Sequence, residues 1–326
     1  MSAAESAARY RRFAQQEARG SSPTYERLAL AVAEDPVTLR FLGQLDPPRR
    51  QPNLLFGALR WHGVDVANPW EALSWLHAHP GDVLSVMRAR RTQTNEAARC
   101  AVLLPALAQL PPPLALIEVG ASAGLCLLYD AWRYRYTGPG IDHEVGPTDC
   151  PVVLHCSVAG DVPLPNEVPT IAWRAGLDLN PIDPGDPESR RWLECLVWPE
   201  HHDRAATLRA ALDVATEVVP VVHQGDLLDG LPALLERAPP SVTTVVAHSA
   251  TLGYVDQHTR TAFLALVAHH GAHRLGLEAP GVVPLPLPAH VPTEGRFIVS
   301  LDDQALGIAH PHGRSLAWLQ RTEVRL

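Results

Sequence analysis

The stretch Leu114-Ala-Leu-Ile-Glu-Val-Gly-Ala-Ser-Ala-Gly-Leu-Cys-Leu-Leu-Tyr-Asp130 carries the strongest pattern in this chain. It begins with an apolar run, typical of a strand, that contains Glu118, and small residues follow at alternate positions: Gly120, Ser122 and Gly124. The run from Leu125 to Trp132 is typical of a helix. A strand, a glycine turn and a helix begin many nucleotide-binding folds, because small residues let a ligand approach the backbone and the helix N-terminus offers free N–H groups.

Three functional interpretations of this turn are open, beside a tight turn that binds nothing. The dinucleotide fingerprint needs glycines at its first, third and sixth positions, but Ser122 and Leu125 occupy the last two. The nucleophile elbow of serine hydrolases, G-x-S-x-G, is matched in full. The first motif of class I S-adenosylmethionine-dependent methyltransferases is an acidic residue followed by G-x-G-x-G, which the turn resembles with Glu118 as the acid and Ser122 as the middle residue.

Composition excludes several classes of function. The chain has 326 residues, enough for one or two domains, and a net charge of -8, so we expect neither a nucleic-acid nor a membrane partner. A small-molecule substrate is expected, while the oligomeric state is open. Every basic side chain apart from histidine is arginine. The absence of lysine excludes a Walker-A phosphate loop, a pyridoxal Schiff base and a lysine base.

The cysteines and histidines do not predict a metal site. No C-x-x-C pair occurs among the five cysteines, and the adjacent pair His201 and His202 has no third ligand at helical or turn spacing. An odd number of cysteines without metal spacing favours a reducing compartment. With no apolar run long enough to span a bilayer, we expect a cytoplasmic protein without a bound metal.

Residues 1–112 are predicted to be helical, and Pro111-Pro-Pro113 marks a domain boundary. This N-terminal helical region is expected to act as a lid or to bind substrate beside an α/β domain of residues 113–326. At the head of its last helix stand the polar residues Asn95, Glu96 and Arg99. They are interpreted either as a helix cap or, for Asn95 and Arg99, as a wall of the ligand pocket.

The remaining chain alternates strands and helices. An inserted hairpin is predicted at about residues 133–160, and the next apolar strand ends at Asp178. A later strand ends at Gly225-Asp226, and another ends at His248-Ser249. The last two strands, 296–301 and 305–309, are too close for a helix and must form an antiparallel hairpin. This order predicts a doubly wound, mostly parallel α/β sheet.

The order of elements resembles the class I methyltransferase fold, a seven-stranded Rossmann-like sheet closed by one antiparallel strand. The resemblance implies S-adenosylmethionine as cofactor, held by residues that match the family by position: Glu118, Gly120, Ser122, Gly124, Asp178, Asp226 and Leu227. Asp178 would accept the ribose hydroxyls, and Asp226 would face the adenine. His248 and Ser249 end the fourth strand, where that superfamily keeps catalytic or substrate-facing residues. The sequence departs from the family at Ser122 and in the long insertion before Asp178.

Blocks along nearly the whole chain resemble an uncharacterised bacterial family, domain of unknown function 2332, which has no assigned reaction. They are Gln93-Thr-Asn-Glu96, Glu118-Val-Gly-Ala-Ser-Ala-Gly124, Trp173-Arg-Ala-Gly-Leu-Asp-Leu-Asn-Pro181, Val197-Trp-Pro-Glu200, His248-Ser249 and His312-Gly313. This resemblance supports the fold and leaves the substrate open.

The favoured function is methyl transfer to a small molecule, with His248 as the general base and Tyr254 closing the site. A neutral imidazole suits proton transfer near neutral pH. In the alternative interpretation of His248, its side chain only hydrogen-bonds a neighbouring loop. The first alternative function is a non-catalytic binding protein on a methyltransferase-like fold. The second alternative is a serine hydrolase with Ser122, Asp226 and His312 in the chain order of a triad. In that fold several strands precede the elbow, whereas helices precede it here.

Overall fold

The computed structural model describes residues 2–288 and 291–319, and the chain forms two compact units. Unit 1 comprises Met1–Thr94 and Asp186–Arg209, and unit 2 comprises Asn95–Gly185 and Ala210–Leu326. The division therefore falls at Thr94 and not near residue 112, and unit 1 includes a second segment from the middle of the chain. Apolar side chains of that segment complete the core of the N-terminal helices, which is why it joins them.

Unit 1 is helical, as its sequence predicts. Its helices are α1 (Ala3–Phe13), the π-helical turn η1 (Ala14–Ala18), α2 (Pro23–Glu34), α3 (Pro36–Leu42), the 3-10 turn η2 (Pro47–Arg49), α4 (Pro52–Trp61), α5 (Pro69–Ala78), α6 (Pro80–Ala89), α8 (Pro187–Leu196) and the first half of α9 (His202–Val218). Most begin with proline, whose fixed φ suits the first helical position. Side chains of Ser22, Asp35, Asn68 and Asp186 cap α2, α3, α5 and α8.

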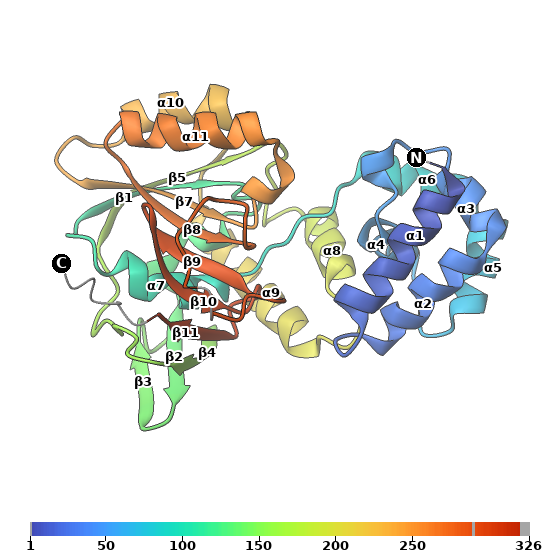
Figure 1. Cartoon of the computed structure of the whole chain (residues 1–326), viewed down its shortest axis with the longest axis horizontal. Helices are drawn as coiled ribbons and strands as arrows, with labels where there is room; N and C mark the ends of the chain where they lie inside the picture. The colour runs from blue at the N-terminus through green and yellow to red at the C-terminus, as the bar shows by residue number, and fades with distance from the viewer. Residues whose placement is uncertain (1, 289–290, 320–326) are drawn as a thin grey trace. The chain divides into compact units, whose positions relative to one another are not determined.

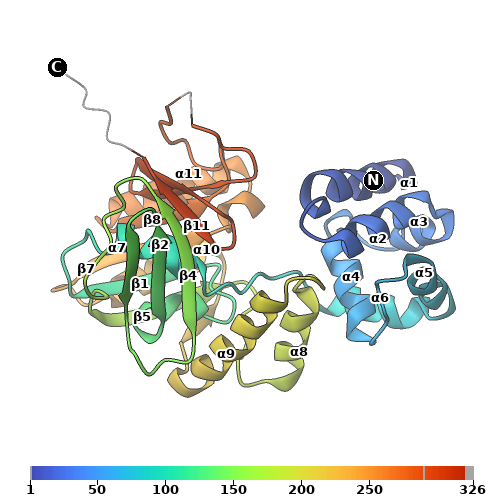
Figure 2. The ribbon, with the colours of Figure 1, turned by 90° about the horizontal axis from the view of Figure 1, so that it is seen from below.

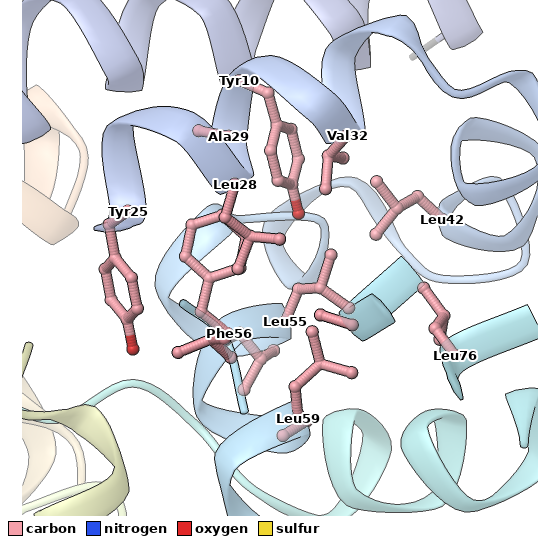
Figure 3. Close-up of a cluster of buried hydrophobic side chains, with 14 of the residues drawn as sticks. Tyr10, Tyr25, Leu28, Ala29, Val32, Leu42, Leu55, Phe56, Leu59 and Leu76 are labelled. Carbon is pink, nitrogen blue, oxygen red and sulfur yellow. The ribbon is translucent and has the colours of Figure 1, made fainter. Parts of the chain in front are cut away.

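The core of unit 1 lies between α1, α2, α4 and α8. Figure 3 shows its centre, where Tyr10 directs its hydroxyl into the cluster and Phe56 packs beside Tyr25 with ring centroids 4.8 Å apart. The three helices α1, α2 and α3 are mutual neighbours (Figure 2). From the second segment, Trp192 packs on Gly57, where an added Cβ would lie 3.1 Å from the indole. Gly57 thus leaves room for α8.

The block Val197-Trp-Pro-Glu200 belongs to unit 1 and has a structural role there. The indole N–H of Trp198 donates to Asn53 Oδ1 at 3.0 Å. Glu200 accepts hydrogen bonds from the Thr24 N–H at 2.9 Å and from the Ser22 hydroxyl. These contacts fasten the segment after α8 to the first turn of α2.

Unit 2 contains one mixed sheet, which has 11 strands within the described residues. The strands are β1 (Leu114–Val119), β2 (Arg133–Gly138), β3 (Ile141–Val145), β4 (Val153–Ala159), β5 (Ile171–Asp178), β6 (Val222–Gln224), β7 (Thr243–Ser249), β8 (His273–Glu278), β9 (Phe297–Leu301), β10 (Gln304–Ala309) and β11 (Ser315–Trp318). Helices α10 (Leu227–Arg237) and α11 (Gln257–His269) cover one face, and α7 (Arg99–Leu107) packs on the other (Figure 1).

The order of the strands is β3-β2-β4-β11-β10-β9-β8-β7-β1-β5-β6. Strands β6, β5, β1, β7 and β8 are parallel, which confirms a mostly parallel α/β arrangement in this half. From β1 the chain adds β5 and β6 on one side, and then β7 and β8 on the other side of β1. The point between β1 and β7 is therefore a topological switch point of the doubly wound kind. The expectation of seven strands is wrong, because β11, β4, β2 and β3 extend the sheet beyond the β9–β10 hairpin.

The segment predicted as an inserted hairpin contains an antiparallel pair, β2 and β3, and a third strand. Strand β4 runs parallel to β2, beside which it lies in Figure 2, and parallel to β11 on its other edge. Such pairing between β4 and β11, far apart in the sequence, leaves no local pattern that predicts it.

The helix expected from Leu125 to Trp132 is absent, and two 3-10 turns replace it, η3 (Leu125–Leu127) and η4 (Tyr129–Ala131). Side chains donate hydrogen bonds to carbonyl groups that would accept backbone N–H groups in an α-helix. The Trp132 indole donates to the Leu125 carbonyl at 3.1 Å, and Arg174 donates to the Leu127 carbonyl at 3.0 Å. The segment is also buried nearly all round, so it has no solvated face to define an amphipathic helix.

Candidate functional site

The glycine turn follows β1 at the switch point and has an unusual backbone. Gly120, Ser122 and Gly124 have φ of 73°, 51° and 71°, in the left-handed region that favours glycine. A Cβ on Gly120 would lie 2.3 Å from Thr251 Oγ1, and one on Gly124 would lie 2.8 Å from Pro220. Close packing therefore explains both glycines, while Ser122 adopts a conformation that costs a non-glycine residue energy.

Asp178 and Ser122 are brought into direct contact at the ends of β5 and β1. The Ser122 N–H donates to Asp178 Oδ2 at 2.8 Å, and the Asn180 N–H donates to Oδ1 at 2.7 Å. Asp178 is half-buried. Because an ionised carboxylate has about four lone-pair sites, the two backbone bonds orient this group and leave acceptor capacity toward solvent.

Asn95 holds the other side of the same turn. Its Nδ2 donates to Ser122 Oγ at 2.9 Å, and its Oδ1 accepts from the Ala123 N–H at 2.9 Å. It does not cap the following helix, since α7 begins at Arg99 after Ala98 without a side-chain cap. Asn95 therefore contacts the glycine turn directly.

Arg99 is buried and joins the end of β7 to the turn before β11. Its Nη1 donates to the Ser249 carbonyl at 3.1 Å, and its Nε donates to the Pro311 carbonyl at 3.0 Å. The next residues of that turn pack on the start of α7. A Cβ on Gly313 would lie 1.9 Å from the Ala98 carbonyl oxygen, and His312 Nδ1 lies 3.4 Å from Glu96 Oε2. The His312-Gly313 block thus has a clear packing role.

Glu118 is a buried carboxyl group at the end of β1. Glu118 is only 4% exposed, and its Oε2 has no hydrogen-bond partner among the described residues. Burial raises the pKa of Glu118 well above its ordinary value of 4.5, with Cys126 adding to the rise and Arg99 opposing it. Burial therefore favours the neutral, protonated form of Glu118, and an unpaired buried polar atom of this kind calls for an explanation.

His248 and Glu278 form a second buried pair. His248 Nδ1 lies 2.9 Å from Glu278 Oε1, and its Nε2 is buried without a hydrogen-bond partner in the described part of the chain. Burial acts to raise the pKa of Glu278, but the hydrogen bonds from His248, Leu252 and Thr251 outweigh it and lower the pKa. The carboxylate of Glu278 is therefore charged at neutral pH.

The side chains of Glu118 and His248 point to opposite faces of the sheet. Val119 pairs with His248 in the β1–β7 register, and successive side chains on a strand alternate between faces. Glu118 lies on the face that α7 covers. Asp178 lies on the same face, because Glu118 pairs with Gly176 and Asp178 is two residues after Gly176 on β5. His248 faces α11, where its ring meets Phe263 edge-on at 5.7 Å.

The remaining expected site residues follow the ends of β6 and β7, and Gly225 donates its N–H to the Asp178 carbonyl at 3.0 Å. Asp226 is exposed and caps α10, accepting the Leu228 N–H at 2.9 Å, while Leu227, the first residue of that helix, is buried. Tyr254 is 85% exposed in a 3-10 turn, η5 (Leu252–Tyr254). The structure thus joins Asn95, Ser122 and Asp178, and separately Arg99 and Ser249.

Two residues near the site were not among those singled out from the sequence. They are Glu278, the acid that ends β8, and Thr251, in the turn after β7. An acid at the end of β8 was a usable signal, because carboxyl ends of parallel strands meet at one edge of a sheet. Nothing in the sequence around Thr251 indicated that it packs on Gly120.

Neither a metal site nor a membrane span is found in the described ranges. No group of three or more His, Cys, Asp or Glu side chains has metal-binding geometry within residues 2–288 and 291–319. The helices over the same residues are too short or too polar to cross a membrane.

Comparison with known proteins identifies a family and no function. The curated proteins give no match, and neither do the solved structures. A family model matches residues 7–318, nearly the whole chain. The chain therefore belongs to the bacterial family described as "Uncharacterized protein conserved in bacteria (DUF2332)".

Proposed function

We propose that unit 2 binds S-adenosylmethionine at the carboxyl ends of β1 and β5 and transfers its methyl group to a small molecule. The observation that carries the proposal is the contact between Asp178 and the Ser122 N–H beside the switch point. Ligands of doubly wound sheets bind outside the strand ends at this point. The class I methyltransferase resemblance of the turn supports this cofactor over other nucleotides.

The side chains around Asp178 suit a nucleoside. Two backbone N–H groups hold the carboxylate, which retains lone pairs for ribose hydroxyls. The next residue, Leu179, is 59% exposed and offers an apolar surface for the face of a base. Asp226 is exposed at the start of α10, where an acceptor for an adenine amino group fits the proposal.

In the chemical step, bound S-adenosylmethionine would supply the methyl group, and the protein holds donor and acceptor in line. His248 is the proposed base, because a neutral imidazole that donates through Nδ1 to Glu278 has its lone pair on Nε2. The residue is 1% exposed, so an acceptor reaches Nε2 only when a neighbour such as Phe263 moves. In the proposal, Ser249 faces the substrate, and Tyr254 closes over it by moving from its exposed position.

Calorimetric titration with S-adenosylmethionine and S-adenosylhomocysteine tests the proposal. Asp178→Ala should weaken binding about 10- to 100-fold, since lost hydrogen bonds to a charged group are worth about 1.5–3 kcal/mol. Asp183→Ala is the matched control, an exposed acid whose Oδ1 accepts the Gly185 N–H, and should bind like the wild type. No binding of either ligand by folded wild-type protein at millimolar concentration would refute the proposal.

The same experiments separate the two alternatives. A non-catalytic binding module on the same fold predicts weak or no binding of either ligand, a filled pocket and no methyl transfer. A serine hydrolase predicts labelling of Ser122 by a fluorophosphonate, abolished by Ser122→Ala. We expect no labelling, because Ser122 is 4% exposed and its Oγ is bonded to the Asn95 amide.

A further inference from the structure

We infer that Glu278 is a positioning residue of this site, one that fixes the tautomer of His248 and holds Thr251 against the glycine turn. The inference rests on the proposed function for its meaning, because the glycine turn and His248 are the proposed cofactor and base positions. Its structural part stands on the hydrogen bonds of Glu278 alone and is testable without a cofactor.

One carboxylate oxygen makes all the contacts. Glu278 Oε1 accepts from His248 Nδ1 at 2.9 Å, from the Thr251 N–H at 3.0 Å and from the Leu252 N–H at 3.0 Å. The residue is 4% exposed, so water does not compete for this oxygen. A buried charge held by several donors defines the geometry of each donor more strictly than an exposed one.

The contact with His248 selects one tautomer. An ionised carboxylate only accepts hydrogen bonds, so Nδ1 must carry the proton. In the neutral ring the lone pair then lies on Nε2, the nitrogen that has no partner within the described residues. Glu278 is the one hydrogen-bond partner of Nδ1 in the part of the chain that the structure describes, so without it no contact there favours protonation of Nδ1 over Nε2.

The contacts with the backbone reach the glycine turn. Ala250 has φ of 52°, so the chain turns sharply after β7 and its next N–H groups point at Glu278. The Thr251 side chain packs over Gly120, and its hydroxyl donates to the Val119 carbonyl at 3.2 Å. Glu278 therefore sets the position of the residue that forms one wall of the glycine turn.

Nitrogen-15 NMR of the imidazoles in the full chain tests the first part. In the wild type near pH 8, His248 should show a protonated Nδ1 and an unprotonated Nε2. The opposite tautomer in the wild type would overturn the inference without any variant. Glu278→Ala should lose this preference, and Glu278→Gln should restore it, because one amide oxygen can accept the same three bonds. The control is Asp302→Ala, which removes the carboxylate 2.9 Å from His273 Nδ1 and should leave His248 unchanged.

Amide hydrogen exchange tests the second part. Glu278→Ala should speed exchange at Thr251 and Leu252 at least tenfold, and Glu278→Gln should restore protection. Unchanged exchange in a folded Glu278→Ala protein would overturn the inference. If Glu278→Ala does not fold, the wild-type tautomer and the Glu278→Gln exchange pattern decide.

Binding of S-adenosylhomocysteine distinguishes the two proposals. Glu278→Ala should weaken it at least tenfold, with Glu278→Gln near the wild type. Wild-type protein that shows the expected tautomer and protection but binds no S-adenosylhomocysteine would refute the proposed function and leave the positioning role intact. Normal binding by a Glu278→Ala protein with exposed Thr251 and Leu252 amides would refute the link to the glycine turn.

Discussion

Replacing Glu118 by glutamine should change how the stability of the protein depends on pH. Glu118 is 4% exposed, and burial raises the pKa of its carboxyl well above 4.5. Above the pKa of the unfolded chain, the folded state holds a proton that the unfolded state has lost. The free energy of unfolding therefore falls as pH rises from that value to the folded pKa. Glutamine does not titrate, so the variant lacks this contribution.

The magnitude follows from linkage. One proton of difference corresponds to about 1.4 kcal/mol per pH unit, so the contribution of Glu118 falls by about this amount for each pH unit between the unfolded pKa and the folded pKa. The variant should gain this amount per pH unit relative to the wild type within that range. Any cost of burying the glutamine amide adds a constant at all these pH values and does not affect the slope.

Urea unfolding of both proteins at several pH values measures the difference. Asp186→Asn is the control, because hydrogen bonds from Ser189 lower the pKa of Asp186 and reverse the sign. Its contribution to stability is complete above the unfolded pKa and is lost as pH falls through the folded one, so its difference should stay constant from about pH 5.5 to 7.5. A constant difference for Glu118→Gln over the same range would refute the reasoning.

Two further predictions concern packing. Tyr10→Phe should raise the free energy of unfolding by about 1 kcal/mol, because the Tyr10 hydroxyl is buried with no hydrogen-bond partner in the described part of the chain, whereas Tyr136→Phe should lower it by about 1 kcal/mol by removing a bond to the Ala101 carbonyl. Urea unfolding that ranks the two variants the other way would contradict this. Gly313→Ala should lower the melting temperature more than Gly20→Ala does. Both glycines have left-handed φ, but only a Cβ on Gly313 would clash with a neighbouring carbonyl. Equal decreases in melting temperature would contradict this.

Local patterns predicted the elements that depend on local chemistry. The apolar run before Glu118 and the β-branched run before His248 are strands, and they pair with each other at the centre of the sheet. Asp178 and Asn95 were singled out because strand ends and helix starts gather polar groups, and both contact the glycine turn. The hairpin of β9 and β10 followed from the short connection between the two runs.

Contacts between distant segments decided what the sequence did not predict. The helix expected after Gly124 gives way to 3-10 turns because Arg174 and Trp132 bond its carbonyls. Strand β11 pairs with β4, although more than half of the residues of unit 2 separate them in the sequence. Neither strand has a local sequence pattern that predicts its partner. Tyr254 looked like a closing group in a turn, but only the fold places its ring in solvent.

The split composition of unit 1 bears on how the chain folds during synthesis. A ribosome releases α1 to α6 well before α8, and β1 to β5 emerge between them. Until Trp192 has been synthesised, the apolar surface of α4 around Gly57, on which Trp192 packs, stays exposed to solvent. The first helices therefore form an incompletely folded bundle during synthesis, and such an intermediate is prone to associate with other chains. A gene rearranged so that residues 186–209 directly follow residue 94 would shorten the time before Trp192 is synthesised and should reduce aggregation of the nascent unit.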